Sequence, residues 1–208
     1  MNFSEFIKKT QIIDTLELGG LNAQFKLAPE FRLSYDKDKI TAKNPKKAAV
    51  LALFYPDENN NTRFLLTKRA TYKGTHSAQI SFPGGKININ DIGLEQTAIR
   101  ETFEEVGIEK KDIKIIKELT DVYIPPSNFL ATPFIGITLK KPIFKTNHEV
   151  ETIIEVLLND LLNDTSIKMV EMTTSYMNKT HVPCFKLNDY IVWGATAMIL
   201  AEIKELLI

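Results

Sequence analysis

Three glutamates lie close together on one predicted helix, and their crowding constrains this sequence more than any other feature. Apolar and weakly polar side chains recur at helical spacing over residues 94–106, and Gly107 is placed to cap that helix. Glu101, Glu104 and Glu105 then project from one side of it. Like charges three or four residues apart each destabilise a helix by about 0.2–0.5 kcal/mol. We therefore expect either a solvated acidic face or a cation site.

The residues around the helix favour the cation site. Gly84 and Gly85, in the sequence FPGG, are interpreted as a turn that brings bare backbone groups close to a ligand. Arg100 adjoins the glutamates and can orient a carboxylate through a bidentate ion pair. Charge runs on helices are usually solvated, but here the glycines, a spacer, the arginine and the paired glutamates occur together and in order. Mg2+ prefers carboxylate oxygens, so we predict a divalent-cation site.

The composition is that of an ordinary soluble protein. The chain has 208 residues, 44% of them hydrophobic, and can bury a core in one domain with or without an extension. Its 26 basic and 26 acidic side chains give a formal net charge of +0, which favours neither nucleic acid nor membrane as a partner. Cys184 is the single cysteine, so an intramolecular disulfide is excluded. No signal-peptide pattern or membrane-spanning apolar run is found, and a cytoplasmic location is expected.

Predicted strands and helices are interspersed along the chain without the strict alternation of a doubly wound sheet. Two strands flank an Asn-rich hairpin loop, at 47–55 and 63–69. Other strands are expected at 78–82, 113–124 and 131–139, at the start of 149–164, and as a pair within 181–194. Helices are expected at 3–17, at the end of 149–164, and at 195–208, whereas 21–45 looks irregular.

These elements predict an α/β fold in which a mixed β-sheet is flanked by helices on both faces. Residues 1–45 are expected to form a helical and irregular extension packed on the core, and residues 46–208 the main domain. Homodimer formation is compatible with these features.

The stretch GGKININDIGLEQTAIRETFEEVGI resembles the Nudix box, the loop-helix signature of hydrolases of nucleoside diphosphates linked to another moiety. The matching positions are Gly85, Arg100, Glu101, Glu104, Glu105, Gly107 and Ile108. Two positions depart from the pattern. Where the pattern has its first glutamate, this sequence has Asp91, and eight rather than seven residues separate it from Arg100. Thr102 occupies a position that is usually aliphatic.

A narrower resemblance covers more of the chain. LLTKRATYKGTHSAQISFPGGK, residues 65–86, is similar to the segment that marks the coenzyme A (CoA) pyrophosphatase branch, with Ala78 in place of a usual glycine. The likeness extends from about Leu18 to the C-terminus. It implies the Nudix α/β/α sandwich and a small-molecule substrate. The implied reaction is hydrolysis of CoA or acyl-CoA to 3′,5′-ADP and (acyl-)4′-phosphopantetheine, with Mg2+ or Mn2+.

The box also implies roles for its residues. Glu101, Glu105 and Glu104 would bind metal, and a backbone carbonyl of Gly84 or Gly85 would complete the protein's share. The general base is open between two positions, Glu101 and Glu149, and Glu151 could replace the latter if the loop is shifted.

Substrate contacts are predicted next to the box. Lys68 and Arg69 end a predicted strand and would contact the CoA phosphates, although ordinary strand-end charges explain them almost as well. His76 would contact phosphate or adenosine. Gln79 and Phe82 would hold the substrate, but a core position explains Phe82 better.

A second segment, the turn PPSN, would bring Ser127 and Asn128 to the pocket, and turn chemistry alone would also explain both.

Two other functions remain open. The box chemistry suits any pyrophosphate bond, so ADP-ribose, NADH or a dinucleotide polyphosphate could be the substrate instead. A nucleotide-binding module without catalysis ranks last, because such modules should tend to lose helix carboxylates and this chain keeps three.

Overall fold

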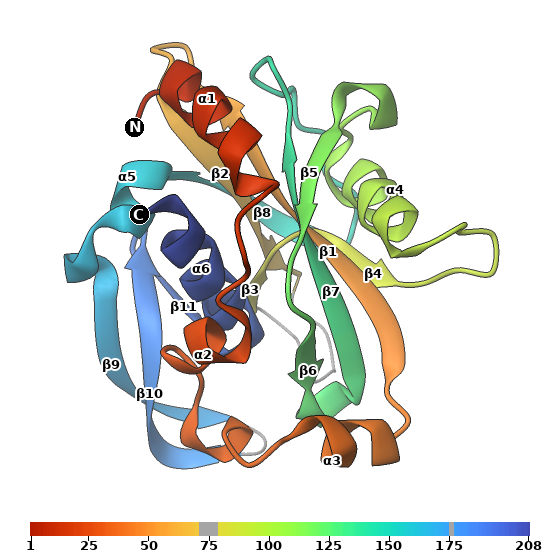
Figure 1. Cartoon of the computed structure of the whole chain (residues 1–208), viewed down its shortest axis with the longest axis vertical. Coiled ribbons are helices and arrows are strands. Elements are labelled where there is room, and N and C mark those ends of the chain that lie inside the picture. Colours follow the sequence, from red (N-terminus) through yellow and green to blue (C-terminus); the bar gives the residue numbers. More distant parts are fainter. Residues whose placement is uncertain (71–78, 175–176) are drawn as a thin grey trace.

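The computed structural model describes residues 1–70, 79–174 and 177–208. Within these ranges, the largest sheet has eight strands, and Figure 1 shows it running through the centre of the molecule. Its central strand, β1 (Lys46–Pro56), pairs antiparallel with β2 (Thr62–Arg69) and β4 (Gly84–Lys86), and parallel with β7 (Phe129–Ile137). The sheet is therefore mixed, as predicted.

The other strands of this sheet extend it on both sides. Strands β3 (Ile80–Ser81) and β8 (Val150–Leu157) pair with β2, while β5 (Lys114–Glu118) and β6 (Val122–Ile124) pair with β7. A separate antiparallel sheet is formed by β9 (Ile167–Thr174), β10 (Met177–Leu187) and β11 (Tyr190–Trp193).

Both faces of β1 are buried because its side chains alternate between two cores. Ala49, Leu51 and Leu53 join one cluster with Ala98 and Val106 of α4 (Leu94–Val106). Ala52 and Phe54 join the opposite cluster, which also contains residues of α1 (Phe3–Ile13) and α6 (Gly194–Leu207). Figure 1 shows α4 on one side of the sheet and α1 and α6 on the other. The predicted α/β/α sandwich is confirmed.

The N-terminal region is more ordered than its sequence indicated. The predicted first helix ends at Ile13, and the span 21–45, expected to be irregular, contains most of α2 (Gly20–Phe25), a 3-10 turn η1 (Glu30–Arg32) and α3 (Lys37–Ala42). The two helices have six residues each, too few for a helical period to be visible in the sequence. Asp36 caps α3 by accepting a hydrogen bond from the backbone N–H of Lys39.

This region packs on the main domain through one aromatic contact in particular. The Phe6 ring is fully buried, and its centroid lies 4.8 Å from that of Phe54 on β1. Glu202 of α6 is also fully buried and accepts hydrogen bonds from the backbone N–H of Gly20 and from the side chain of Gln24. Residues 1–45 thus share the core with the sheet.

Two local predictions were wrong, and one strand was missed. The Pro-Gly-Gly segment is a strand, not a turn: β4 lies against β1, and a Cβ on Gly84 would come within 2.3 Å of the Ala49 carbonyl oxygen. The expected strand 113–124 is divided into β5 and β6, although Leu119, between them, still donates its N–H to the Pro133 carbonyl of β7. Strand β9 was not predicted, and half or more of its side chains are exposed, so it lacks an apolar pattern. None of the helices in the described ranges is long and apolar enough to cross a bilayer.

Candidate active site

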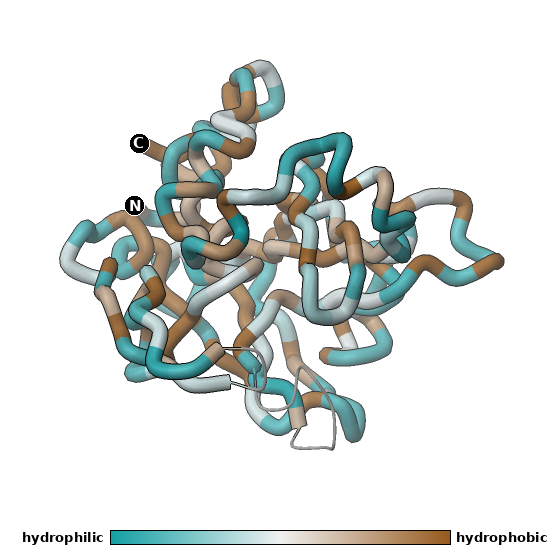
Figure 2. Tube along the Cα trace, turned by 90° about the horizontal axis from the view of Figure 1, so that it is seen from below, coloured by the Kyte–Doolittle hydropathy of each residue, from teal (hydrophilic) through white to brown (hydrophobic). Residues whose placement is uncertain are grey.

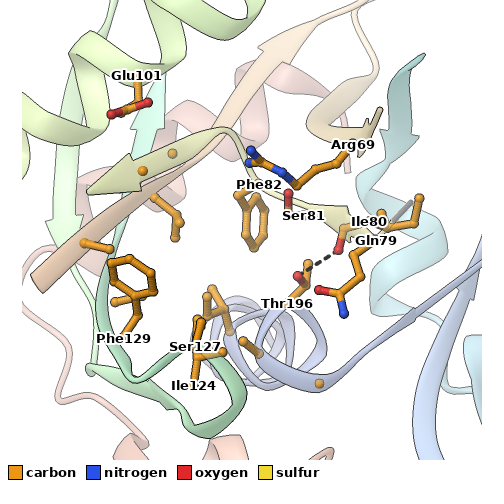
Figure 3. A pocket seen from close by; sticks show the side chains of 18 of the residues that line it. Arg69, Gln79, Ile80, Ser81, Phe82, Glu101, Ile124, Ser127, Phe129 and Thr196 are labelled. Carbon is orange, nitrogen blue, oxygen red and sulfur yellow. Dashed lines mark hydrogen bonds between the residues drawn. The ribbon is translucent and has the colours of Figure 1, made fainter. Parts of the chain in front are cut away.

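A cavity of about 460 Å³ opens between β4, β6 and the start of α6. Figure 3 shows Glu101 and Arg69 on one side of it and Ser127 and Ile124 on the other, with Phe82 between them. Its wall is part charged and part apolar. The residues that line it are Arg32, Ala48, Val50, Arg69, Gln79, Ile80, Ser81, Phe82, Gly84, Gly85, Lys86, Glu101, Glu105, Ile124, Ser127, Phe129, Ala131, Glu149, Trp193, Gly194, Ala195, Thr196 and Ile199.

Helix α4 supplies two carboxylates to the cavity. Glu105 is 3% exposed and accepts hydrogen bonds from the Gly84 N–H and from Arg69 Nη1, both at 3.2 Å. Its burial raises the pKa of Glu105 to about 7, although Arg69 and the Gly84 N–H act in the opposite direction. Burial also raises the pKa of Glu101, which Arg100 partly offsets through a hydrogen bond of 2.8 Å.

The third carboxylate of the helix lies outside the cavity wall. Glu104 is exposed, and its Oε2 accepts a hydrogen bond from Arg100 Nη1 at 3.0 Å. An α-helix turns by about 100° per residue, so Glu104 and Glu105 diverge on either side of Glu101. The three glutamates share one side of α4, but Glu104 is not brought into the cavity with the other two.

Arg100 forms its bidentate ion pair with Asp91 rather than with a helix glutamate. Nε and Nη2 of Arg100 donate to the two oxygens of Asp91 at 2.9 and 2.8 Å. Asp91 also accepts from the Asn88 N–H and from Thr97 Oγ1, and the hydrogen bonds from Arg100 hold the pKa of Asp91 well below its usual range. Asp91, whose place in the box the longer spacer left uncertain, therefore fixes the orientation of Arg100. The remaining N–H groups of Arg100 reach Glu101, Glu104 and the Lys86 carbonyl.

Gly85 is required by a close approach between β4 and α4. A Cβ on Gly85 would lie 2.5 Å from Cδ of Glu101, so any other residue at this position would displace that carboxylate. The two glycines of β4 thus place bare backbone directly beside the carboxylates.

Arg69, at the end of β2, connects the acidic helix to the start of β8. Its Nη2 donates to Glu149 at 2.8 Å, and its Nη1 donates to Glu105. The Nε of Arg69 is buried, without a hydrogen-bond partner among the described residues. Of the two acids that could serve the site from this later segment, Glu149 lines the cavity, whereas Glu151 pairs with Lys68 outside it.

Some of the predicted substrate contacts line the cavity, and others lie outside it. Gln79, Phe82 and Ser127 line the cavity. Lys68 and Asn128 do not: Asn128 accepts a hydrogen bond from the Tyr123 hydroxyl and donates one to the Lys43 carbonyl, so its polar atoms hold the turn together. The prediction for His76 lies outside the described residues.

Several cavity residues were missed by the sequence reasoning. Arg32 comes from the segment that looked irregular, and Trp193, Gly194, Ala195 and Thr196 from the start of α6. Nothing in the local sequence separates Arg32 from an ordinary surface arginine. Only the tertiary structure brings it to the cavity.

Comparison with known proteins identifies the family. A family model described as a NUDIX domain matches residues 45–170. Nudix hydrolase 15, mitochondrial, from Arabidopsis thaliana is 32% identical over 176 residues, 81% of this chain and 60% of the relative. Nudix hydrolase 22, chloroplastic, from the same plant is 30% identical over 75% of this chain and 53% of the relative. The chain therefore belongs to the Nudix family.

The chain spans only about half to three fifths of these plant relatives. A bacterial relative from Yersinia pestis, called an uncharacterized Nudix hydrolase NudL, is 29% identical over 68% of this chain and 70% of its own length. Among solved structures, a MutT/nudix family protein from Enterococcus faecalis superposes with a TM-score of 0.53 and 14% identity, over 84% of this chain and 64% of that one. This likeness supports the shared fold.

Proposed function

We propose that this chain is a divalent-metal-dependent hydrolase that cleaves the pyrophosphate bond of CoA or acyl-CoA, releasing 3′,5′-ADP and (acyl-)4′-phosphopantetheine. The observation that carries the hydrolytic chemistry is that Glu101, Glu105 and Glu149 line a single cavity, where Arg69 joins Glu105 to Glu149. The choice of CoA is supported by the resemblance of residues 65–86 to the CoA pyrophosphatase branch. An apolar wall that includes Ile124 and Phe129 offers room for the less polar parts of such a substrate.

The residues at the acidic end fit Mg2+ or Mn2+. Carboxylate and backbone oxygens are the donors that such hard cations prefer, and the raised pKa values of Glu101 and Glu105 reflect burial that nearby positive charge does not fully offset. No three acidic, histidine or cysteine side chains in the described residues already meet in ligand geometry. In the proposal, Glu101 and Glu105 are the main ligands, Glu104 is the third carboxylate that α4 can supply, and Gly84 or Gly85 adds a carbonyl oxygen.

The bound cation would neutralise pyrophosphate oxygens and lower the pKa of a bound water. The chain's own residues orient the reactants. Arg69 lines the cavity and would donate N–H groups to the substrate phosphates. Arg100, held by Asp91, keeps Glu101 in position.

Glu149 is proposed as the general base, because it lines the cavity and is more exposed to water than Glu101, at 46% against 18% of the side chain. In the proposed step, water gives its oxygen to one phosphorus and its proton to the base. The bond from that phosphorus to the bridging oxygen breaks, and the bridging oxygen leaves with the electron pair on the second phosphate.

The test is hydrolysis of CoA, acetyl-CoA, a long-chain acyl-CoA, ADP-ribose and NADH with Mg2+ or Mn2+, with products identified by mass. Release of 3′,5′-ADP from the CoA substrates is the expected result. Preference for ADP-ribose or NADH would replace CoA as the substrate, and no turnover of any compound would favour a binding module. Glu149→Gln should lower kcat by about 100-fold or more. Glu151→Gln is its matched control, because Glu151 lies two residues away and outside the cavity wall.

A further inference from the structure

The end of the cavity opposite the carboxylates contains a buried cation. Arg32 is 6% exposed and lines the cavity from η1. Its Nη1 donates to the Tyr123 carbonyl at 2.8 Å and contacts the sulfur of Met198 at 3.5 Å. A guanidinium stays protonated inside proteins, so it gives this end of the cavity a positive charge.

The N-terminus of α6 adds positive potential at the same place. Gly194, Ala195 and Thr196 line the cavity, and a Cβ built on Gly194 would lie 3.9 Å from Arg32 Nη2. The first N–H groups of a helix have no intrahelical acceptor and carry about half a positive charge. Trp193 precedes the helix and has no side-chain oxygen to cap it. The Thr196 hydroxyl is already bound to the Ile80 carbonyl at 3.0 Å.

Ser127 supplies a third donor group. Its Oγ is buried and has no hydrogen-bond partner among the described residues. The residue follows β6, the strand whose Tyr123 carbonyl holds Arg32, and β6 packs on α6. Figure 3 shows Ser127 on the side of the cavity away from Glu101 and Arg69. A charged guanidinium, a helix N-terminus and a buried hydroxyl therefore line one end of the cavity.

We propose that this end of the cavity binds a phosphomonoester of the substrate, and that in CoA this group is the 3′-phosphate. A phosphomonoester carries about −1.5 to −2 charge at neutral pH and offers three strong acceptor oxygens, which suits these donors. This inference rests on the proposed function, because it takes CoA as the substrate. It makes Arg32 and the start of α6 the determinants that separate CoA from nucleotides lacking that phosphate, such as ADP-ribose and NADH.

The test compares the hydrolysis of CoA with that of 3′-dephospho-CoA, which differs only in the phosphate. Charged hydrogen bonds predict that the wild type prefers CoA by about 10- to 100-fold in kcat/KM. In Arg32→Met this ratio should fall towards one, mainly through a higher KM for CoA. Arg63→Met is the matched control, because Arg63 pairs with Asp57 and does not line the cavity.

A second variant tests the inference even if Arg32→Met does not fold. Ala195→Asp places an acid in the first turn of α6, where negative charge stabilises a helix, but it should repel a phosphate. It should therefore fold and also lose the preference for CoA. A ratio that stays at the wild-type level in either folded variant would overturn the inference.

Binding measurements separate this inference from the proposed function. Calorimetric titration with 3′,5′-ADP and with 5′-AMP, without metal, should show about 10-fold or more tighter binding of 3′,5′-ADP. If the wild type hydrolyses CoA and dephospho-CoA equally well, the phosphate site is wrong and the proposed function stands. If it hydrolyses neither, the proposed function fails, and the titration alone decides the phosphate site: equal binding of the two nucleotides would refute it.

Discussion

Replacing Glu105 by glutamine should stabilise the metal-free protein while abolishing its activity. Glu105 is 3% exposed, and its pKa is about 7 in the folded chain against an ordinary value of 4.5. At 1.36 kcal/mol per pKa unit, that difference corresponds to about 3 kcal/mol. Glutamine has nearly the same shape and cannot ionise, so the variant avoids this cost.

The sign of the effect follows from the raised pKa. The folded chain binds the proton of Glu105 more strongly than the unfolded chain does. The stability that the protonated group contributes is complete below pH 4.5 and is lost as the pH rises through about 7. Glu105→Gln should therefore exceed the wild type by about 1 kcal/mol at pH 5 and by about 3 kcal/mol at pH 8. For a chain of this size, the second value raises Tm by about 6–12 °C.

Thermal unfolding of both proteins at pH 5 and pH 8, with a chelator present, measures this difference. Adding Mn2+ should remove most of the difference at pH 8, because a ligand at 100 times its Kd stabilises the wild type by about 2.7 kcal/mol and the variant has lost a metal ligand. Pyrophosphate hydrolysis should fall by about 1000-fold or more. A variant less stable than the wild type at pH 8, or a difference that does not change with pH, would refute the burial argument. Glu95→Gln, an exposed change on the same helix, is the control.

Three further changes test other contacts. Gly85→Ala should lower kcat by about 100-fold, because the new Cβ would lie 2.5 Å from Glu101 Cδ and must displace that carboxylate. Circular dichroism should show little loss of folded structure. Steady-state kinetics measures kcat, and an unchanged value would contradict the prediction. Asp91→Asn should lower the free energy of unfolding by about 1–3 kcal/mol at neutral pH. Because the pKa of Asp91 is lowered in the folded chain, this loss should shrink as the pH falls below 3.8. Urea unfolding at pH 7 and pH 3 measures the loss, and a loss that grows in acid would be inconsistent with the ion pair. Phe6→Ala should lower the free energy of unfolding by about 3–5 kcal/mol, because the ring is fully buried against Phe54. An unchanged midpoint of urea unfolding would show that residues 1–45 are not part of the core.

Strong local patterns allowed much of the fold to be predicted from the sequence. Helix α4 matches the predicted span 94–106, and the hairpin of β1 and β2 lies where segments rich in aliphatic and aromatic residues flank the Asn-rich loop. Elements stabilised by tertiary contacts were missed. Strand β4 exists because glycines let it approach β1, and β9 mixes polar and apolar side chains, most of them exposed. Neither feature produces a helical or strand period in the sequence.

In the candidate site, too, the features with a local sequence pattern were predicted, and those that depend on tertiary contacts were not. The box predicted that Glu101 and Glu105 would lie together, because their spacing on a helix fixes their relative directions. It could not show that Arg100 uses its bidentate geometry on Asp91, since that pair depends on the path of the loop between β4 and α4. The role of Arg69 in joining Glu105 to Glu149 depends on the pairing of β2 with β8, which no local pattern encodes.

The cavity wall combines residues from inside and from outside the span that matches the family model. Its carboxylates all lie within residues 45–170, which match the family model, whereas Arg32 and the first turn of α6 lie outside that span. In Figure 2, which views the molecule from below, polar and apolar segments alternate along the trace. A homologue could therefore keep the hydrolytic helix unchanged and acquire a new substrate by replacing only its two ends. Grafting the segments around Arg32 and α6 between relatives would then transfer selectivity without redesign of the hydrolytic residues.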